Sequence, residues 1–202
     1  RNTIDSLIAS NNLPFTQSGA VTGISNSGAV ANGYIFKNNI YQLTTTGTFP
    51  ANTTLATGIV SSAGTTVNIF NNYVSNLQAP SSSSATALSG IQISGGANVN
   101  VYYNTVYLNG TWTYLGLASF GSSAIYLSST TPTVDMRNNI FENTSAAGLV
   151  GGSSCTVGLR RTTSATTGYS SLSNNNCFYG AASNGQSSGA YYNASSVGSI
   201  GV

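Results

Sequence analysis

The sequence predicts an all-β solenoid in which parallel strands from about five coils, each of roughly 33 residues, stack on one another. The first observation is a motif, Val67-Asn68-Ile69-Phe70-Asn71-Asn72-Tyr73-Val74, which returns at 99–106 and 134–141, with an earlier copy at 34–41 and a weaker one at 172–177. The second is a column of aliphatic residues, each after Gly or Ala, that keeps the same period: Ile24, Ile59, Ile91, Ile125 and Leu159. Both patterns alternate apolar and polar residues, as strands do, and no segment has a helical period with caps.

The coils follow one another through a single domain, residues 1–202. Residues 1–22 are expected to form a partial first coil, because Asn2–Leu7 matches Asn72–Leu77 position by position. Each later coil should place one strand at the aliphatic column, a second before the motif asparagine and a third after it. Residues 181–202 are the terminal segment.

The alternation also predicts which side chains point inward. The inward set comprises the residues five and three before the last motif Asn and the residue two after it: Tyr34, Phe36, Tyr41, Val67, Ile69, Val74, Val99, Val101, Val106, Val134, Met136, Phe141 and Cys177. The motif asparagines should turn the chain in the left-handed conformation and stack as an internal hydrogen-bonded ladder: Asn39, Asn72, Asn104, Asn139 and Asn175. The alternative is that these asparagines only mark polar turns.

Cys155 and Cys177 are the two cysteines of the chain. In a secreted protein two cysteines most simply form one disulfide, which would hold the last coil together. The alternative is a pair of buried free thiols, since Cys177 replaces an inward apolar residue.

The Val-x-Ile-x-Asn-Asn-x-Val motif resembles the right-handed parallel β-helix repeats of secreted bacterial proteins, of the kind grouped with pectate lyases. The Asn-, Ser- and Thr-rich variant is most similar to large bacterial surface proteins. The resemblance runs from about Gly23 to Tyr179. It implies a right-handed, single-stranded parallel β-helix, and it says little about function, because this fold carries lyases, hydrolases, adhesins and stalks.

Composition argues against catalysis and against several kinds of partner. The chain has no His, only three carboxylates (Asp5, Asp135 and Glu142) and 4% charged residues. Glycoside hydrolysis needs two carboxylates around one bond, and a zinc site needs four ligands. Asp135 is better explained as a partner of Arg137 or Lys37. We therefore expect no enzyme, no catalytic or metal site and no cofactor. The net charge of +2 is too small for nucleic acid, and no apolar run is long enough to span a membrane.

An outward row is expected two residues before the ladder positions: Lys37, Phe70, Tyr102 and Arg137. Aromatic groups on a flat sheet could stack on sugar rings or bury a protein contact. Alternatively, the segment Thr111–Phe120 or a neighbouring molecule covers this row.

These patterns predict a secreted, extracellular or cell-surface bacterial module with a structural or adhesive role. Copies of the chain are expected to associate into a fibre or surface layer, or the module to form part of a longer surface protein, because little charge opposes pairing of strand edges. The first alternative is a carbohydrate-binding β-helix without catalysis, with glycans as partners. The second is a degenerate polysaccharide lyase.

Overall fold

A computed structural model describes residues 2–11, 19–47, 53–113, 119–146, 148, 154–163, 167–181, 191–193 and 196–198. Within these ranges no residue lies in a helix, and the strands stack as a parallel β-solenoid. The fold class expected from the repeats is therefore confirmed. None of the described residues belongs to a helix that is long and apolar enough to cross a membrane.

Four sheets run along the solenoid. The six-stranded sheet contains β1 (Asn2–Ile4), β5 (Asn38–Ile40), β9 (Tyr73–Ser75), β13 (Thr105–Leu108), β16 (Ile140–Asn143) and β18 (Cys177–Gly180). The four-stranded sheet contains β4 (Asn32–Phe36), β8 (Thr66–Phe70), β12 (Asn98–Tyr102) and β15 (Thr133–Arg137). The seven-stranded sheet contains β3 (Ala20–Asn26), β7 (Leu55–Ser61), β11 (Leu88–Ile93), β14 (Ser122–Leu127), β17 (Thr156–Arg161), β19 (Tyr191–Asn193) and β20 (Ser196–Gly198). The three-stranded sheet contains β2 (Ile8–Asn11), β6 (Leu43–Gly47) and β10 (Leu77–Gln78).

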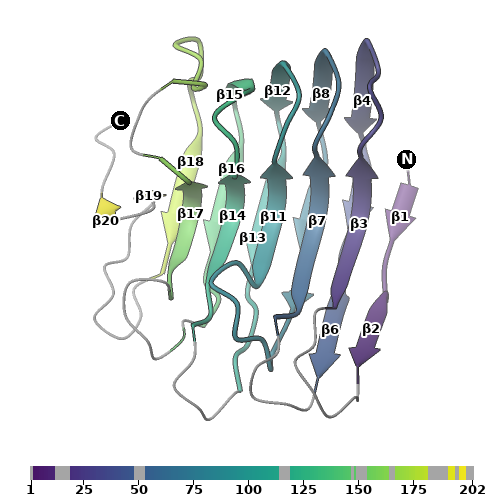
Figure 1. The fold of residues 1–202 in the computed structure, drawn as a ribbon, viewed down its shortest axis with the longest axis vertical. Helices are drawn as coiled ribbons and strands as arrows, with labels where there is room; N and C mark the ends of the chain where they lie inside the picture. Colours follow the sequence, from purple (N-terminus) through teal and green to yellow (C-terminus); the bar gives the residue numbers. More distant parts are fainter. Residues whose placement is uncertain are drawn as a thin grey trace.

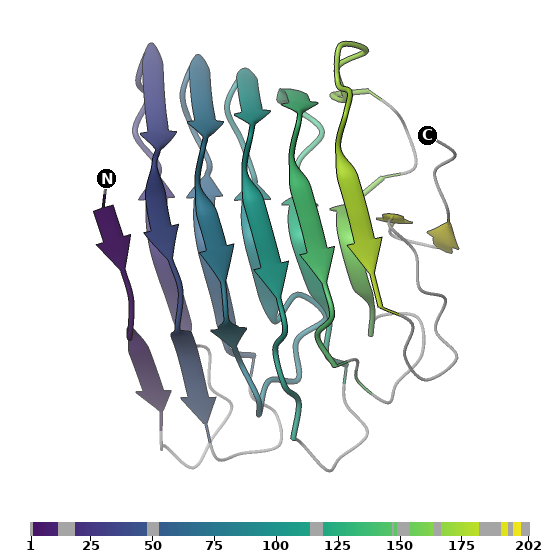
Figure 2. The ribbon, with the colours of Figure 1, turned by 180° about the vertical axis from the view of Figure 1, so that it is seen from behind.

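The coils wind in a right-handed sense. In Figure 1 the near strands β3, β7, β11, β14 and β17 run upward while successive coils step from right to left. Figure 2 shows the strands of the opposite side running downward. All pairings between coils are parallel in the described part of the chain, and the pair β19–β20 is antiparallel.

The solenoid completes about four turns, whereas the sequence suggested five. Among the described residues, four coils contribute a strand to the sheet of β4, β8, β12 and β15. In place of a strand, the described residues of the next coil form two isolated bridges with β15, Val134 with Tyr169 and Arg137 with Asn174. The fifth copy of the motif is the weakest in sequence, and its coil stays incomplete on this side.

The core consists of aliphatic columns stacked coil on coil. Val67, Val99 and Val134 are Cα partners in adjacent strands and are at most 1% exposed, as predicted. The residues two positions later in each strand, and those two positions after the ladder, are also buried: Ile69, Val101, Met136, Val74, Val106 and Phe141.

The small residues before the aliphatic column allow two sheets to approach each other. A Cβ atom added to Gly90 would lie 2.3 Å from Cγ1 of Val106 and 2.5 Å from the carbonyl oxygen of Ala124. Gly58 stands in the same relation to Val74, at 2.4 Å. Glycine is needed here because the opposite sheet occupies the space of a side chain.

A ladder of asparagine side chains runs along the corner between the four-stranded and six-stranded sheets. Its members are Asn2, Asn38, Asn72, Asn104, Asn139 and Asn176. In each step from Asn38 onward, one Oδ1 accepts hydrogen bonds from both the backbone N–H and the Nδ2 of the asparagine in the preceding coil. For example, Asn104 Oδ1 accepts from Asn72 N at 3.1 Å and from Asn72 Nδ2 at 2.9 Å. The amides thus satisfy backbone groups that the corner would otherwise leave buried and unpaired.

The ladder positions expected in the first and last coils were wrong by one residue. Asn38 takes the place expected of Asn39, and Asn176 takes that expected of Asn175. A shift of one residue exchanges the two faces of a strand. Four residues expected inside therefore do not lie in the core: Tyr34 is 61% exposed, Phe36 is 45% exposed, Cys177 is exposed and Tyr41 is only partly buried.

The left-handed bend lies one residue earlier than expected in the middle coils and two residues earlier in the first coil, whereas in the last coil it lies at Asn175 as expected. The residue before each ladder asparagine has a φ near +54°: Lys37 (54°), Asn71 (55°), Tyr103 (54°), Asn138 (56°) and Asn175 (52°). The bend turns these five side chains outward, and the ladder asparagine that follows it points inward. A lysine or tyrosine in this conformation costs about 1–2 kcal/mol, which asparagine and glycine largely avoid.

Candidate functional site

The outer surface on both sides of the ladder corner carries most of the large apolar side chains that the described residues expose. They are Tyr34 and Phe36 on β4, Tyr103 at the bend, Tyr73 on β9, Ile140 on β16 and Tyr179 on β18. Exposed apolar groups concentrated in one region of a soluble protein commonly mark an interaction surface.

On the four-stranded side, an aromatic row runs across the coils. The Cα partners are Phe36, Phe70, Tyr102 and Arg137, so the row contains Phe36 where the sequence suggested Lys37. The rings of Phe36 and Phe70 stack 5.0 Å apart at 5°, and the guanidinium carbon of Arg137 lies 5.5 Å from the ring centre of Tyr102. Since the stacked phenyl rings cover each other, the row is better suited to stiffening the sheet than to presenting ring faces to a ligand.

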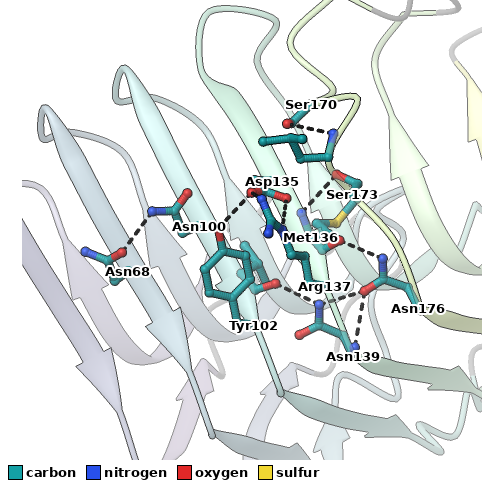
Figure 3. Close-up of polar contacts among 12 residues, drawn as sticks. Asn68, Asn100, Tyr102, Asp135, Met136, Arg137, Asn139, Ser170, Ser173 and Asn176 are labelled. Atoms are coloured by element: carbon teal, nitrogen blue, oxygen red, sulfur yellow. Dashed lines mark hydrogen bonds and ion pairs between the residues drawn. The ribbon is translucent and has the colours of Figure 1, made fainter.

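Asp135 joins the charged end of the aromatic row to Tyr102, as Figure 3 shows. The Tyr102 hydroxyl donates to Asp135 Oδ2 at 2.7 Å, and Arg137 donates through Nε to Oδ1 at 3.0 Å and through Nη2 to Oδ2 at 2.5 Å. The predicted pairing of Asp135 with Arg137 is confirmed. The hydrogen bonds from Arg137 hold the pKa of Asp135 below its ordinary value. Burial, together with the hydrogen bond to the Asp135 carboxylate, raises the pKa of Tyr102 to about 12.

Uncharged hydrogen-bonding groups lie on the same outer face. Asn100 Nδ2 donates to Asn68 Oδ1 at 2.9 Å on adjacent strands. Figure 3 shows these two amides in line with Asp135, one strand apart from each other. The four-stranded face therefore presents amides, hydroxyls and one neutralised ion pair.

The corner itself forms an open groove of about 560 Å³, which we call the corner groove. Its lining residues come from three successive coils: Lys37, Asn38, Asn39, Asn71, Asn72, Tyr73, Tyr103 and Thr105. Asn38 and Asn72 are at most 5% exposed and form its deepest part, whereas Tyr73 is 43% and Tyr103 is 60% exposed. The Oδ1 atom of Asn39 is buried and has no hydrogen-bond partner in the structure.

Sequence reasoning placed Lys37 in the outward row, whereas the structure places it in the groove lining, and the groove itself was missed. The two tyrosines of the groove occupy the positions directly before and after a ladder asparagine. Aligning the coils on their aliphatic residues would have shown that both positions face outward. The position before the ladder asparagine is Asn in three of the five coils, and the position after it has no recurring residue type, so the motif gave no signal for a tyrosine at either.

Trp112, near the start of the segment 111–120 that was expected as a possible cover, packs against the hydrophobic core. Trp112 packs against Phe120, with ring centres 6.1 Å apart, and its Nε1 donates to the carbonyl oxygen of Ser82 at 3.0 Å. Residues 114–118 of this segment lie outside the described residues.

The suggested disulfide is absent, because Cys155 and Cys177 are both free thiols. The shift of register in the last coil turns Cys177 outward, while Phe178 points inward and stacks on Phe141 at 5.4 Å. Cys155 is 2% exposed, and burial raises the pKa of its thiol. The alternative of two buried thiols is therefore correct for Cys155 alone.

The corner presents amides, a hydroxyl, an ammonium group and two tyrosine rings, which can hydrogen-bond and stack. No group of three His, Cys, Asp or Glu residues that could hold a metal ion occurs within the described ranges.

No protein-family model, curated protein or solved structure matches the chain.

Proposed function

We propose that this protein is an extracellular adhesive module that binds carbohydrate without catalysis through the outer surface of the ladder corner. The observation that carries the proposal is the pair of exposed tyrosines Tyr73 and Tyr103, which line the corner groove with amides, together with the exposed Tyr34 on the four-stranded face. One face of a pyranose ring is formed by C–H groups, which pack on the π-face of an aromatic ring, while its hydroxyls pair with amides and hydroxyls.

The composition supports an extracellular setting. With 4% charged residues, the chain presents a surface of hydroxyls and amides, which suits contact with neutral polymers better than contact with nucleic acid. The rigid solenoid adds to this, because a pre-formed site binds with a smaller loss of conformational entropy than a flexible one.

The experiment is affinity electrophoresis in gels that contain soluble polysaccharides, neutral in one series and anionic in another. The test variant is Tyr34→Asn/Tyr73→Thr/Tyr103→Asn, in which each tyrosine takes the residue type found at the equivalent position of an adjacent coil: Asn68, Thr105 and Asn71. We expect at least one polysaccharide to retard the wild type and to leave the triple variant unretarded.

A matched control is Leu172→Ser, which removes an exposed apolar side chain away from the groove lining. It should be retarded like the wild type. A wild type that migrates freely in every gel, or a triple variant that is retarded as strongly as the wild type, would contradict the proposal.

Association between copies is a second candidate, favoured by the outer strands of the sheets. β1, β2, β3 and β4 are each the last strand of their sheet on one side, and Ile8 of β2 is 70% exposed. Unpaired strand edges with little charge can template pairing with another chain. Sedimentation velocity at micromolar concentration tests this: we expect oligomers that Ile8→Lys dissociates, and a strictly monomeric wild type would rule the candidate out.

A further inference from the structure

The corner groove runs along the solenoid axis, across the strands. Its lining residues come from three successive coils: residues 37–39 in the first, residues 71–73 in the second, and Tyr103 and Thr105 in the third. Adjacent coils of a parallel sheet are about 4.8 Å apart, so the outer two coils of the groove are separated by about 10 Å. A ligand that uses the whole groove must therefore be extended and must cross one coil after another.

The walls of the groove combine ring surface with uncharged polar groups. Tyr103 stands before a ladder asparagine and Tyr73 stands after one, so the two rings border the groove on opposite sides of the ladder. Asn39 and Asn71 bring side-chain amides to the lining, and an amide can both donate hydrogen bonds to ligand hydroxyls and accept them.

The charge of the groove limits the kind of chain that it can hold. Lys37 is the one charged residue among the eight that line it. A polyanion with a charge on every unit would bring several anions into a groove with a single cation, and the unmatched charges would lose hydration without gaining a partner. An uncharged chain avoids this cost, and the Lys37 ammonium can donate hydrogen bonds to its hydroxyls.

We propose that the corner groove binds a single uncharged linear polysaccharide chain, lying lengthwise along the solenoid axis. This inference rests on the proposed carbohydrate binding and adds the class of the ligand, its orientation and the residues that select it. Tyr73 and Tyr103 each pack on a sugar ring, and Asn39, Asn71 and Lys37 hydrogen-bond the hydroxyls.

The test is isothermal titration calorimetry with linear oligosaccharides of two to six units. The neutral probes are β-1,4-glucan, β-1,3-glucan, β-1,4-mannan, β-1,4-xylan and chitin oligomers, and the anionic probes are oligogalacturonate and oligoguluronate. We expect at least one neutral series to bind, with an affinity that rises with length until the three coils are spanned and then levels. Binding to this series should change less than about twofold between low and high salt, because no ion pair contributes.

Two variants locate the chain in the groove. Tyr103→Asn and Tyr73→Thr each remove one ring but keep a residue type that the neighbouring coil uses in the same backbone conformation, so the fold is retained. Each should weaken binding of the neutral hexamer by about tenfold or more, since aromatic anchors dominate such interfaces. Leu172→Ser, outside the groove lining, is the control and should weaken it by less than about threefold, whereas Tyr34→Asn tests whether the four-stranded face contributes to binding.

The outcomes separate this inference from the proposed function. If only the anionic oligomers bind, or if Tyr34→Asn abolishes neutral binding while the groove variants do not weaken it, the inference is wrong and carbohydrate binding stands. If no oligosaccharide of either kind binds, both are wrong. If affinity for a neutral series does not increase with length, the lengthwise orientation is overturned.

Discussion

Replacing Asn104 by leucine should test the ladder, because Asn104 lies in its middle with partners in both neighbouring coils. Its Oδ1 accepts from Asn72 N and Asn72 Nδ2, and its Nδ2 donates to Asn139 Oδ1 at 3.0 Å and to the carbonyl oxygen of Ile69 at 2.9 Å. The residue is 1% exposed, so water cannot replace the lost partners without opening the corner.

The expected cost follows from the groups that Asn104→Leu leaves behind. Asn72 N loses its acceptor and the Ile69 carbonyl loses a donor, whereas Asn72 Nδ2 keeps the carbonyl oxygen of Ile35 and Asn139 Oδ1 keeps the backbone N–H of residue 104. A buried polar group without a partner costs about 1–3 kcal/mol. Since Ile69 also lies within the paired strands β8 and β12, only the Asn72 N–H is counted as unpaired, and the free energy of unfolding falls by about 1–3 kcal/mol. For a chain of this size that corresponds to a decrease in Tm of roughly 2–12 °C.

The assay is thermal unfolding followed by circular dichroism, with Asn100→Leu as the control. Asn100 lies in the same coil but faces outward, where it makes one hydrogen bond to Asn68 at 2.9 Å and both groups can reach water. Its replacement should cost about 1 kcal/mol or less. Equal decreases in Tm for the two variants, or an unchanged Tm for Asn104→Leu, would refute the ladder as a stabilising element.

Three further predictions concern packing, thiols and ionisation. Gly90→Ala should cost about 1–3 kcal/mol in unfolding experiments, because its Cβ would overlap a valine methyl and a backbone carbonyl, whereas Gly28→Ala, with no atom closer than 3.8 Å, should be near neutral; equal effects would contradict the close packing of the two sheets. Ellman's reagent should react quickly with Cys177 in the native protein and with Cys155 only after unfolding, and a denatured, unreduced protein without thiols would show that a disulfide exists after all. Spectrophotometric titration should find a tyrosine with a pKa of about 12 that Tyr102→Phe removes. Because the folded chain holds the Tyr102 proton more tightly than the unfolded chain, the contribution of this hydroxyl to folding stability is present below about pH 10 and is lost as the pH rises toward 12. A titration in which all tyrosines ionise near pH 10 would contradict this prediction.

The coil period and the aliphatic columns could be predicted from sequence because they depend on local alternation and on a repeat of constant length. The ladder could be placed in the middle coils for the same reason. In the first coil either Asn38 or Asn39 could have been the ladder residue. The preceding strand β4 has apolar residues on both of its faces, so its alternation did not decide between them. Burial of Ile35 and Ile40 decided between the two registers.

A rule based on aliphatic spacing would have resolved that ambiguity. In the middle coils the ladder asparagine follows an inward aliphatic residue by three positions and precedes another by two, as Ile69 and Val74 do around Asn72. Only Asn38 satisfies this rule in the first coil. The corner groove could not be foreseen from the motif. Tyr73 and Tyr103 occupy different positions of the repeat, each position has a tyrosine in one coil, and the two rings come together only when the coils are stacked.

The most direct test of the proposed binding is a crystal structure of the protein with the neutral hexasaccharide that binds most tightly. The account predicts a single sugar chain in the corner groove, parallel to the solenoid axis, with pyranose rings against Tyr73 and Tyr103 and a hydroxyl within hydrogen-bond distance of the Asn71 side-chain amide. A sugar chain bound at another face, or one lying along a strand instead of across the coils, would contradict it.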